Sequence, residues 1–242
     1  SFMDFVNGLV EGGLKTLPAA ASCACAGIVI GVVNLTGLGL RFSQLAMQLA
    51  RNSTFWALFG TMIMLIVLGM GLPAVASYVI GAAVAGPTLI GLGIAPLTAH
   101  LFIFYFSCIS SITPPVALAA YLAAGIADAN PLRTAFTACY IGFPVFVVPY
   151  MFVQSSALLL EGPFLVVLRV VVTSIIGVLG ITFGTIGYFR CRIPILLRVL
   201  SFGCGLLLID PAPITDIIGI SGLALVIIVN YFQSKKELRM KV

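Results

Sequence analysis

Three hydroxyl side chains and two prolines fall within six residues, in the segment Ser110-Ser111-Ile112-Thr113-Pro114-Pro115. A proline has no backbone N–H to donate, and the residue before it is disfavoured in helical conformation. The proline pair therefore frees helix carbonyl groups beside the hydroxyl oxygens. Such oxygens are what a hard cation such as Na⁺ requires. The alternative is a proline kink whose hydroxyl groups bond back to the preceding turn.

A second break, Gly69-Met70-Gly71-Leu72-Pro73, also interrupts apolar sequence. Glycine commonly ends a helix and proline commonly occupies the first turn of the next one, so this segment fits a connection between two helices. The tip of a re-entrant hairpin has the same sequence chemistry. Both interpretations stay open at this point.

A third segment, Asn34-Leu35-Thr36-Gly37-Leu38-Gly39, combines small and polar residues in the same way. Its prediction as a break is weaker, because small residues also allow helices to pack closely in membranes. His100 is the one histidine of the chain, and we expect it to have a structural or interfacial role.

The elements that carry these breaks must lie in a membrane. The 242 residues are 61% hydrophobic and 8% charged, whereas about a quarter of the residues in a soluble domain are charged. The mean hydropathy is +1.22. The dispersed net charge of +5 argues against nucleic acid as a partner, and the cysteines show neither a disulfide framework nor a metal site.

The sequence predicts an all-α polytopic membrane protein whose partner is the lipid bilayer. Its apolar runs cover residues 17–40, 55–72, 74–94, 97–126, 135–160, 164–189, 195–209 and 217–232. We expect two parts: residues 1–134, whose broken helices form half of a transport domain, and residues 135–242, which add plainer membrane spans. Ser1 is not a typical start, so we expect the chain to be a fragment.

Charges in the loops predict the orientation. Arg190, Arg192 and Arg198 fill one loop and lysines fill the C-terminal tail, so both are expected in the cytoplasm, as short Lys- and Arg-rich segments are. Arg169 lies inside an apolar run. We expect its side chain to extend to the headgroups, with an ion pair as the alternative.

Four segments together resemble the large membrane subunit of a TRAP transporter (tripartite ATP-independent periplasmic transporter). They are GIVIGVVNLTGLGL, LGMGLPAVASYVI, HLFIFYFSCISSITPPVALAAYLAAGIADANPLRTA and PAPITDIIGISGLAL. They span nearly the whole chain, and the nearest resemblance is to the fused type, which carries both membrane subunits on one chain.

The resemblance implies an elevator-type ion transporter with two inverted repeats, each containing a hairpin and an interrupted helix. This chain matches the second repeat and the extra C-terminal spans. The implied function is ion-driven uptake of an organic acid, such as a C4-dicarboxylate, across the bacterial inner membrane. The implied partners are a periplasmic solute-binding protein, the missing N-terminal half and the small membrane subunit. Na⁺ is the expected coupling ion, with H⁺ as the alternative, and no other cofactor is expected.

The resemblance also implies roles for particular residues. The substrate-binding residues would be Ser110, Ser111, Thr113, Pro114 and Pro115. The ion-binding residues would be Gly69, Gly71, Ser77, Thr36 and Gly37. Many unfused relatives have an acidic residue where this chain has Pro73, and fused relatives tend to have threonines where it has Ala74 and Val75. The absence of an acidic residue at Pro73 argues against a carboxylate ion ligand there, and Ser77 is the nearest remaining hydroxyl.

Other classes fit the sequence less well. A channel would repeat charged or carbonyl-lined pore motifs, and a membrane enzyme would place acidic, basic or nucleophilic residues within its spans. Neither pattern is evident, so no enzymatic activity is expected. A membrane scaffold and another ion-coupled carboxylate transporter remain as alternatives.

Overall fold

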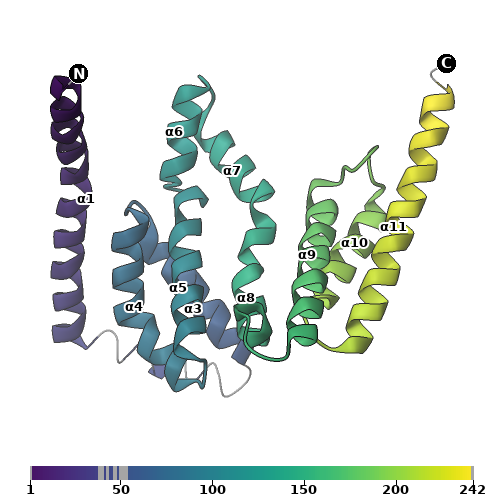
Figure 1. The fold of residues 1–242 in the computed structure, drawn as a ribbon, viewed down its shortest axis with the longest axis horizontal. Coiled ribbons are helices and arrows are strands. Elements are labelled where there is room, and N and C mark those ends of the chain that lie inside the picture. The colour runs from purple at the N-terminus through teal and green to yellow at the C-terminus, as the bar shows by residue number, and fades with distance from the viewer. Residues whose placement is uncertain (1, 38–40, 42–43, 46–47, 49–53, 241–242) are drawn as a thin grey trace. The chain divides into compact units, whose positions relative to one another are not determined.

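The computed structural model describes residues 2–37, 41, 44–45, 48 and 54–240. Within these residues the regular elements are helical, apart from an isolated bridge between Tyr188 and Arg192 (Figure 1). The α-helices are α1 (Phe2–Thr36), α3 (Thr54–Gly69), α4 (Ala74–Gly91), α5 (Pro96–Ile109), α6 (Leu118–Ile126), α7 (Pro131–Ile141), α8 (Val148–Gln154), α9 (Phe164–Ile186), α10 (Ile195–Leu207) and α11 (Pro213–Met240). The 3-10 turns are η1 (Ser110–Ile112), η2 (Phe143–Phe146) and η3 (Ser156–Leu159).

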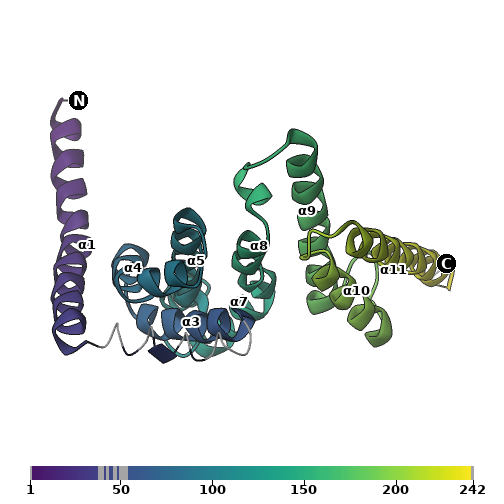
Figure 2. The same ribbon diagram turned by 90° about the horizontal axis from the view of Figure 1, so that it is seen from below.

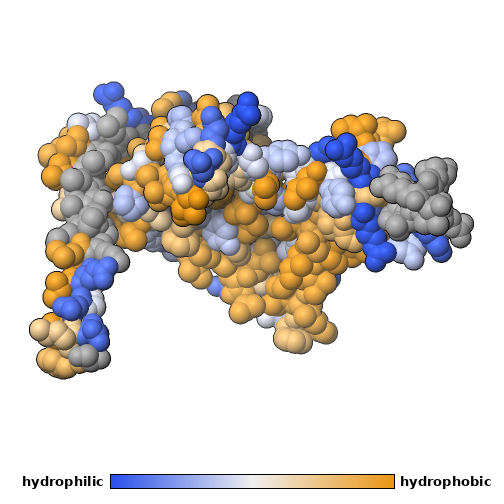
Figure 3. Space-filling view, turned by 90° about the horizontal axis from the view of Figure 1, so that it is seen from above, coloured by the Kyte–Doolittle hydropathy of each residue, from blue (hydrophilic) through white to orange (hydrophobic). Residues whose placement is uncertain are grey.

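Three helices in the described residues are long and apolar enough to cross a membrane: α4, α9 and residues Pro213–Gln233 of α11. Large apolar side chains remain exposed on them, including Leu165 at 76% and Ile217 at 70%. Figure 3 shows hydrophobic residues over much of the visible surface, with hydrophilic residues in small separate patches. Lipid can cover such side chains whereas water cannot. The predicted fold class, an all-α polytopic membrane protein, is confirmed.

The chain forms two compact units, Ser1–Ala135 and Phe136–Val242. In the first unit α3, α4 and α5 pack against one another, and α1 contacts α4. Figures 1 and 2 show α4 and α5 side by side. Their core includes the fully buried Leu65 and Ile103, and both come so close to Gly81 that a Cβ there would lie 2.7 and 2.9 Å from their side chains. Gly81 therefore sets the distance between α4 and its neighbours.

In the second unit, α9 packs against α10 through a stripe of glycines. Gly177, Gly180 and Gly184 follow one face of α9, and a Cβ at Gly184 would lie 2.8 Å from the backbone nitrogen of Phe202. The Ser201 hydroxyl donates a hydrogen bond of 2.8 Å to the Gly180 carbonyl across the same contact. Small residues and interhelical hydrogen bonds are what hold helices together where the surrounding lipid is as apolar as the side chains.

The predicted apolar run over residues 135–160 forms a bent series of helical segments and not one straight helix. The structure has α7, η2, α8 and η3 there, and the first pair of helical segments is bent by 59°. Pro144 explains the bend, because it follows the break directly and has no N–H to donate to the Tyr140 carbonyl. This unit therefore contains a break that the plainer texture of its sequence did not predict.

Arg169 on α9 pairs with Asp216 in the first turn of α11. The Arg169 Nε lies 3.1 Å from Asp216 Oδ2, and its guanidinium also donates to the Pro211 carbonyl. The Asp216 side chain is 8% exposed and that of Arg169 is 40% exposed. The expected extension to the headgroups is thus replaced by its alternative, an ion pair. A carboxylate at this position is also favoured by the positive end of the helix dipole.

Removing the arginine leaves the Asp216 carboxylate buried without its counter-ion. We expect Arg169→Gln to lower the free energy of unfolding by about 2 kcal/mol, less than a fully buried pair because Arg169 is partly exposed. Thermal unfolding in detergent measures the loss. Arg133→Gln, which removes the same charge from α7, is the control. The double variant Arg169→Leu with Asp216→Leu should recover the loss, and failure to recover would contradict a role limited to charge pairing.

Candidate functional site

The break after α5 has a defined course. The helix tightens into η1, and Thr113 is then extended at φ −94° and ψ 124°. Ala117 adopts a left-handed conformation at φ 39° and α6 starts at the next residue. The Pro114–Pro115 bond is cis. Since neither proline has an N–H, Pro114 and Pro115 cannot donate to the Ser110 and Ser111 carbonyls, and the Thr113 N–H donates to the Ser110 carbonyl at 3.3 Å instead. The interrupted helix predicted from the sequence is confirmed at this position.

The other break is a tight turn between two packed helices. Residues 70–73 connect α3 to α4, and the Leu72 N–H donates to the Gly69 carbonyl at 3.2 Å. Gly71 has a φ of +78°, which favours glycine, and a Cβ there would lie 3.7 Å from the Val116 side chain. The turn therefore contacts the interrupted helix. Whether this hairpin is re-entrant stays a prediction.

A buried group of hydroxyls lies where the two breaks meet. Ser77 of α4, Ser107 of α5 and Ser110 of η1 are each 1% exposed, and we call them the buried serine cluster. The Ser110 hydroxyl donates to the Ser107 carbonyl at 2.7 Å and approaches the Gly69 carbonyl at 3.2 Å. A Cβ at Gly69 would lie 2.5 Å from Ser110 Oγ and 2.6 Å from Ser77 Oγ. Only a glycine leaves room for both hydroxyls here.

Two of the three hydroxyls have no hydrogen-bond partner in the structure. Ser77 Oγ and Ser107 Oγ are both in this state although they are buried. An unsatisfied buried hydroxyl costs about 1–3 kcal/mol, so such groups call for an explanation such as a bound ion or water. Oxygens held in this way are suited to coordinate a small cation.

The electrostatics of the site come from the backbone. No Asp, Glu, Lys or Arg occurs between Thr54 and Ala127. The helices α3 and α5 both end at the buried serine cluster, and a helix C-terminus carries about half a negative charge. The helices α4 and α6 start beside the same breaks, and neither has a side-chain hydrogen bond at its N-cap. Their free N–H groups present positive partial charge.

The structure brings some of the predicted site residues together. Gly69, Ser77 and Ser110 meet in the cluster, and Gly71 lies at the turn beside it. The Ser111 and Thr113 hydroxyls bond back to the Cys108 and Ile109 carbonyls at 2.6 and 2.8 Å, as in the alternative interpretation, but their oxygens keep lone pairs for a ligand. Pro114 and Pro115 shape the break.

The remaining predicted residues, Thr36 and Gly37, end α1. The Thr36 hydroxyl donates to the Val32 carbonyl at 2.7 Å, and a Cβ at Gly37 would meet no atom within 4 Å. Neither is part of the cluster. Leu38 and Gly39, the end of this predicted break, lie outside the described residues.

Sequence reasoning missed Ser107. It lies one helical turn before Ser110, so it faces the same side of α5, and its hydroxyl lies 3.8 Å from the Cβ position of Gly81. The spacing of three residues between Ser107 and Ser110 could have indicated that both hydroxyls lie on one face of the helix. His100, expected to be structural, lies 3.0 Å from the Tyr78 hydroxyl through Nδ1.

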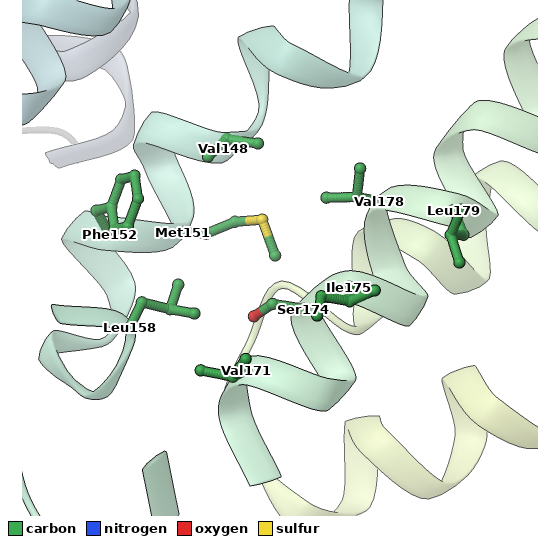
Figure 4. A pocket seen from close by; sticks show the side chains of 9 residues that line it. All are labelled: Val148, Met151, Phe152, Leu158, Val171, Ser174, Ile175, Val178 and Leu179. Atoms are coloured by element: carbon green, nitrogen blue, oxygen red, sulfur yellow. The ribbon is translucent and has the colours of Figure 1, made fainter. Parts of the chain in front are cut away.

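A separate cavity in the second unit does not suit a charged solute. It has a volume of 370 Å³ and lies between α8, η3 and α9 (Figure 4). Ser174 is the one polar side chain among the residues that line it, and Figure 4 shows its hydroxyl facing Met151. In the described residues no three His, Cys, Asp or Glu side chains gather as a metal site would require.

Apolar helices that are broken around a buried cluster of neutral oxygens define an integral membrane protein of the transporter class. Residues 1–166 match the family model described as "Tripartite ATP-independent periplasmic transporter, DctM component". The chain belongs to this family of TRAP transporter permease components, which confirms the resemblance found in the sequence. No curated protein and no solved structure is significantly similar to the chain.

Proposed function

We propose that this chain forms the ion- and solute-binding part of a TRAP permease that takes up an organic acid, driven by a Na⁺ gradient. The observation that carries the proposal is the buried serine cluster between two helix breaks, with two hydroxyls that lack partners. Proton coupling is the less favoured alternative, because residues 54–127 contain no carboxylate that a proton could titrate.

A cation is favoured at the cluster by charge as well as by ligand type. The hydroxyl oxygens of Ser77 and Ser110 and the Gly69 carbonyl oxygen lie together as neutral donors of lone pairs, and Ser107 is on the same side of α5 as Ser110. The C-terminal ends of α3 and α5 supply negative partial charge. Na⁺ is bound in transporters by unwound carbonyls and helix C-termini of this kind.

An organic anion is favoured next to the cation. The N-termini of α4 and α6 lie at the same two breaks and lack side-chain caps, so their N–H groups can donate to a carboxylate. A bound cation would add attraction for the same anion. We therefore propose that Ser111, Thr113 and the N-terminus of α6 contact the solute, a carboxylate of the C4-dicarboxylate kind.

The proposal extends to the assembly. We infer the fused type of permease, working in the bacterial inner membrane as an elevator with this chain as its second repeat. Its C-terminus is in the cytoplasm, where the arginine and lysine loops are retained. A periplasmic solute-binding protein delivers the solute, and the first repeat and small-subunit portion complete the transporter.

Uptake measurements on the complete transporter test the site. Thr113→Ala and Ser111→Ala remove hydroxyl oxygens at the break, and we expect each to reduce uptake about tenfold, since one hydrogen bond to a charged group is worth about 1.5–3 kcal/mol. The Na⁺ concentration for half-maximal uptake should rise as well. Uptake into proteoliposomes with an imposed Na⁺ gradient measures both quantities.

Thr134→Ala is the matched control. The Thr134 hydroxyl makes the same bond to the carbonyl four residues earlier, at 2.9 Å, but on the exposed helix α7. It should leave uptake and Na⁺ dependence unchanged. Unchanged uptake in both site variants would remove the solute assignment from Ser111 and Thr113.

A further inference from the structure

A turn and the end of a membrane helix are fixed together in the second unit. Asn230 of α11 is fully buried, and its side-chain amide donates to the Cys191 carbonyl at 3.3 Å and contacts Cys191 Sγ at 3.2 Å. Its amide oxygen accepts from the Arg190 N–H at 3.3 Å. Figure 1 shows this connection between α9 and α10 beside α11. One buried side chain thus holds the turn against the helix.

The turn and the helix line an open pocket of 410 Å³. It is lined by Phe189, Arg190, Ile227, Ile228, Tyr231 and Phe232. The aliphatic and aromatic residues of α11 in this lining are 41–65% exposed and belong to its membrane-spanning part. The Arg190 guanidinium lies 5.2 Å from the centre of the Tyr231 ring, a cation–π contact that keeps the charge at the mouth of the pocket.

The charge around this pocket has one sign. Arg190, Arg192 and Lys235 are exposed at this end of the unit. No acidic residue occurs between Gly162 and Ile209, and Glu237 is the sole acidic residue of a tail that also contains Lys236, Arg239 and Lys241. The acidic residues Asp210 and Asp216 lie before and at the start of α11, at its opposite end. The pocket therefore combines an apolar lining with excess positive charge at its mouth.

We propose that this pocket binds one anionic phospholipid of the surrounding bilayer. Its phosphate is paired with the Arg190 guanidinium and attracted by Arg192 and Lys235, and one acyl chain lies along Ile227, Ile228 and Phe232. A soluble anion would pair with the basic residues but would leave the apolar lining exposed to water. A lipid pairs with the basic residues through its phosphate and covers the apolar lining with its acyl chain. The site does not depend on the proposed transport function.

Native mass spectrometry of the detergent-purified full chain tests the proposal, with phosphatidylglycerol or phosphatidylcholine titrated in. We expect one tightly bound phosphatidylglycerol and at least tenfold weaker binding of phosphatidylcholine. Arg190→Gln should weaken phosphatidylglycerol binding about tenfold, Arg190→Lys should weaken it less, and the control Arg133→Gln should leave it unchanged.

A second variant separates the site from the fold. Ile228→Trp places a larger side chain in the pocket at a residue that is 54% exposed, so it should fold and still lose the bound lipid. The proposal is overturned if Ile228→Trp keeps the lipid, if phosphatidylcholine binds equally, or if inorganic phosphate alone displaces phosphatidylglycerol. Loss of the lipid in both Arg190→Gln and Ile228→Trp, with retention in Arg133→Gln, establishes it.

Discussion

Replacing Gly69 with alanine is expected to reduce uptake by the complete transporter by a factor of ten to one hundred. The new Cβ would lie 2.5 Å from Ser110 Oγ, 2.6 Å from Ser77 Oγ and 2.8 Å from Ser110 Cβ. Overpacking of this kind costs about 1–3 kcal/mol. Because about 1.4 kcal/mol changes an equilibrium tenfold, the arrangement in which the two breaks contact each other would become correspondingly less populated.

The glycine that ends the next helix, α4, gives the matched control. Gly91 ends α4, and a Cβ there would meet no atom within 4 Å. Gly91→Ala should therefore leave uptake unchanged. Equal loss in both variants would show that an added methyl group reduces uptake even where it meets no atom, and the contact between the breaks would not be the cause.

A double variant separates crowding from lost chemistry. Ser110→Gly removes two of the three atoms that a Gly69 Cβ would meet most closely, and Ser77 Oγ stays, so Gly69→Ala with Ser110→Gly should recover part of the thermal stability. It should not recover Na⁺-dependent uptake, because the Ser110 hydroxyl is then absent. Recovery of full Na⁺-dependent uptake would contradict a ligand role for Ser110.

Ser77→Ala should raise the thermal stability of the ion-free protein and reduce the stabilisation that Na⁺ adds. The Ser77 hydroxyl is buried and has no partner, at a cost of about 1–3 kcal/mol. Alanine removes that cost, so the ion-free variant should unfold about 2–4 °C higher per kcal/mol regained. With the hydroxyl gone, the stabilisation by Na⁺ should fall by about 1.4 kcal/mol, because the site binds about tenfold more weakly.

The measurement is thermal unfolding in detergent at increasing NaCl, with choline chloride at matched ionic strength. Thr61→Val is the control, because the Thr61 hydroxyl is also fully buried but donates to the Ala57 carbonyl at 2.8 Å. It should leave the response to Na⁺ unchanged. If Ser77→Ala is destabilising and its response to Na⁺ matches that of the unchanged protein, the hydroxyl serves the fold and not an ion.

Much of the first unit could be predicted from the sequence, because its breaks are made by residues with strong local effects. Pro114 and Pro115 end a helix wherever they occur, and Gly69 and Gly71 permit a turn between two apolar helices. The contact between these breaks could not be predicted. It depends on the packing of α3, α4 and α5, which brings residues 41 positions apart within hydrogen-bond distance.

In the second unit, too, contacts between helices could not be predicted from the sequence. Its apolar texture suggested plain spans, yet Gly177, Gly180 and Gly184 form a close contact with α10. Small residues at this spacing are a signal for helix packing, and composition alone hides it. The pairing of Arg169 with Asp216 likewise depends on where α11 starts relative to α9, which no local pattern determines.

The absence of charged residues between Thr54 and Ala127 has an electrical consequence. A side chain of unit charge that crosses a membrane potential exchanges about 2.3 kcal/mol with it per 100 mV. The side chains of this segment exchange no such energy with the membrane potential, however far the segment moves. In the proposed transport cycle, movement of this segment would therefore exchange energy with the potential through the bound ions and solute alone, and the return of the empty segment would be insensitive to voltage.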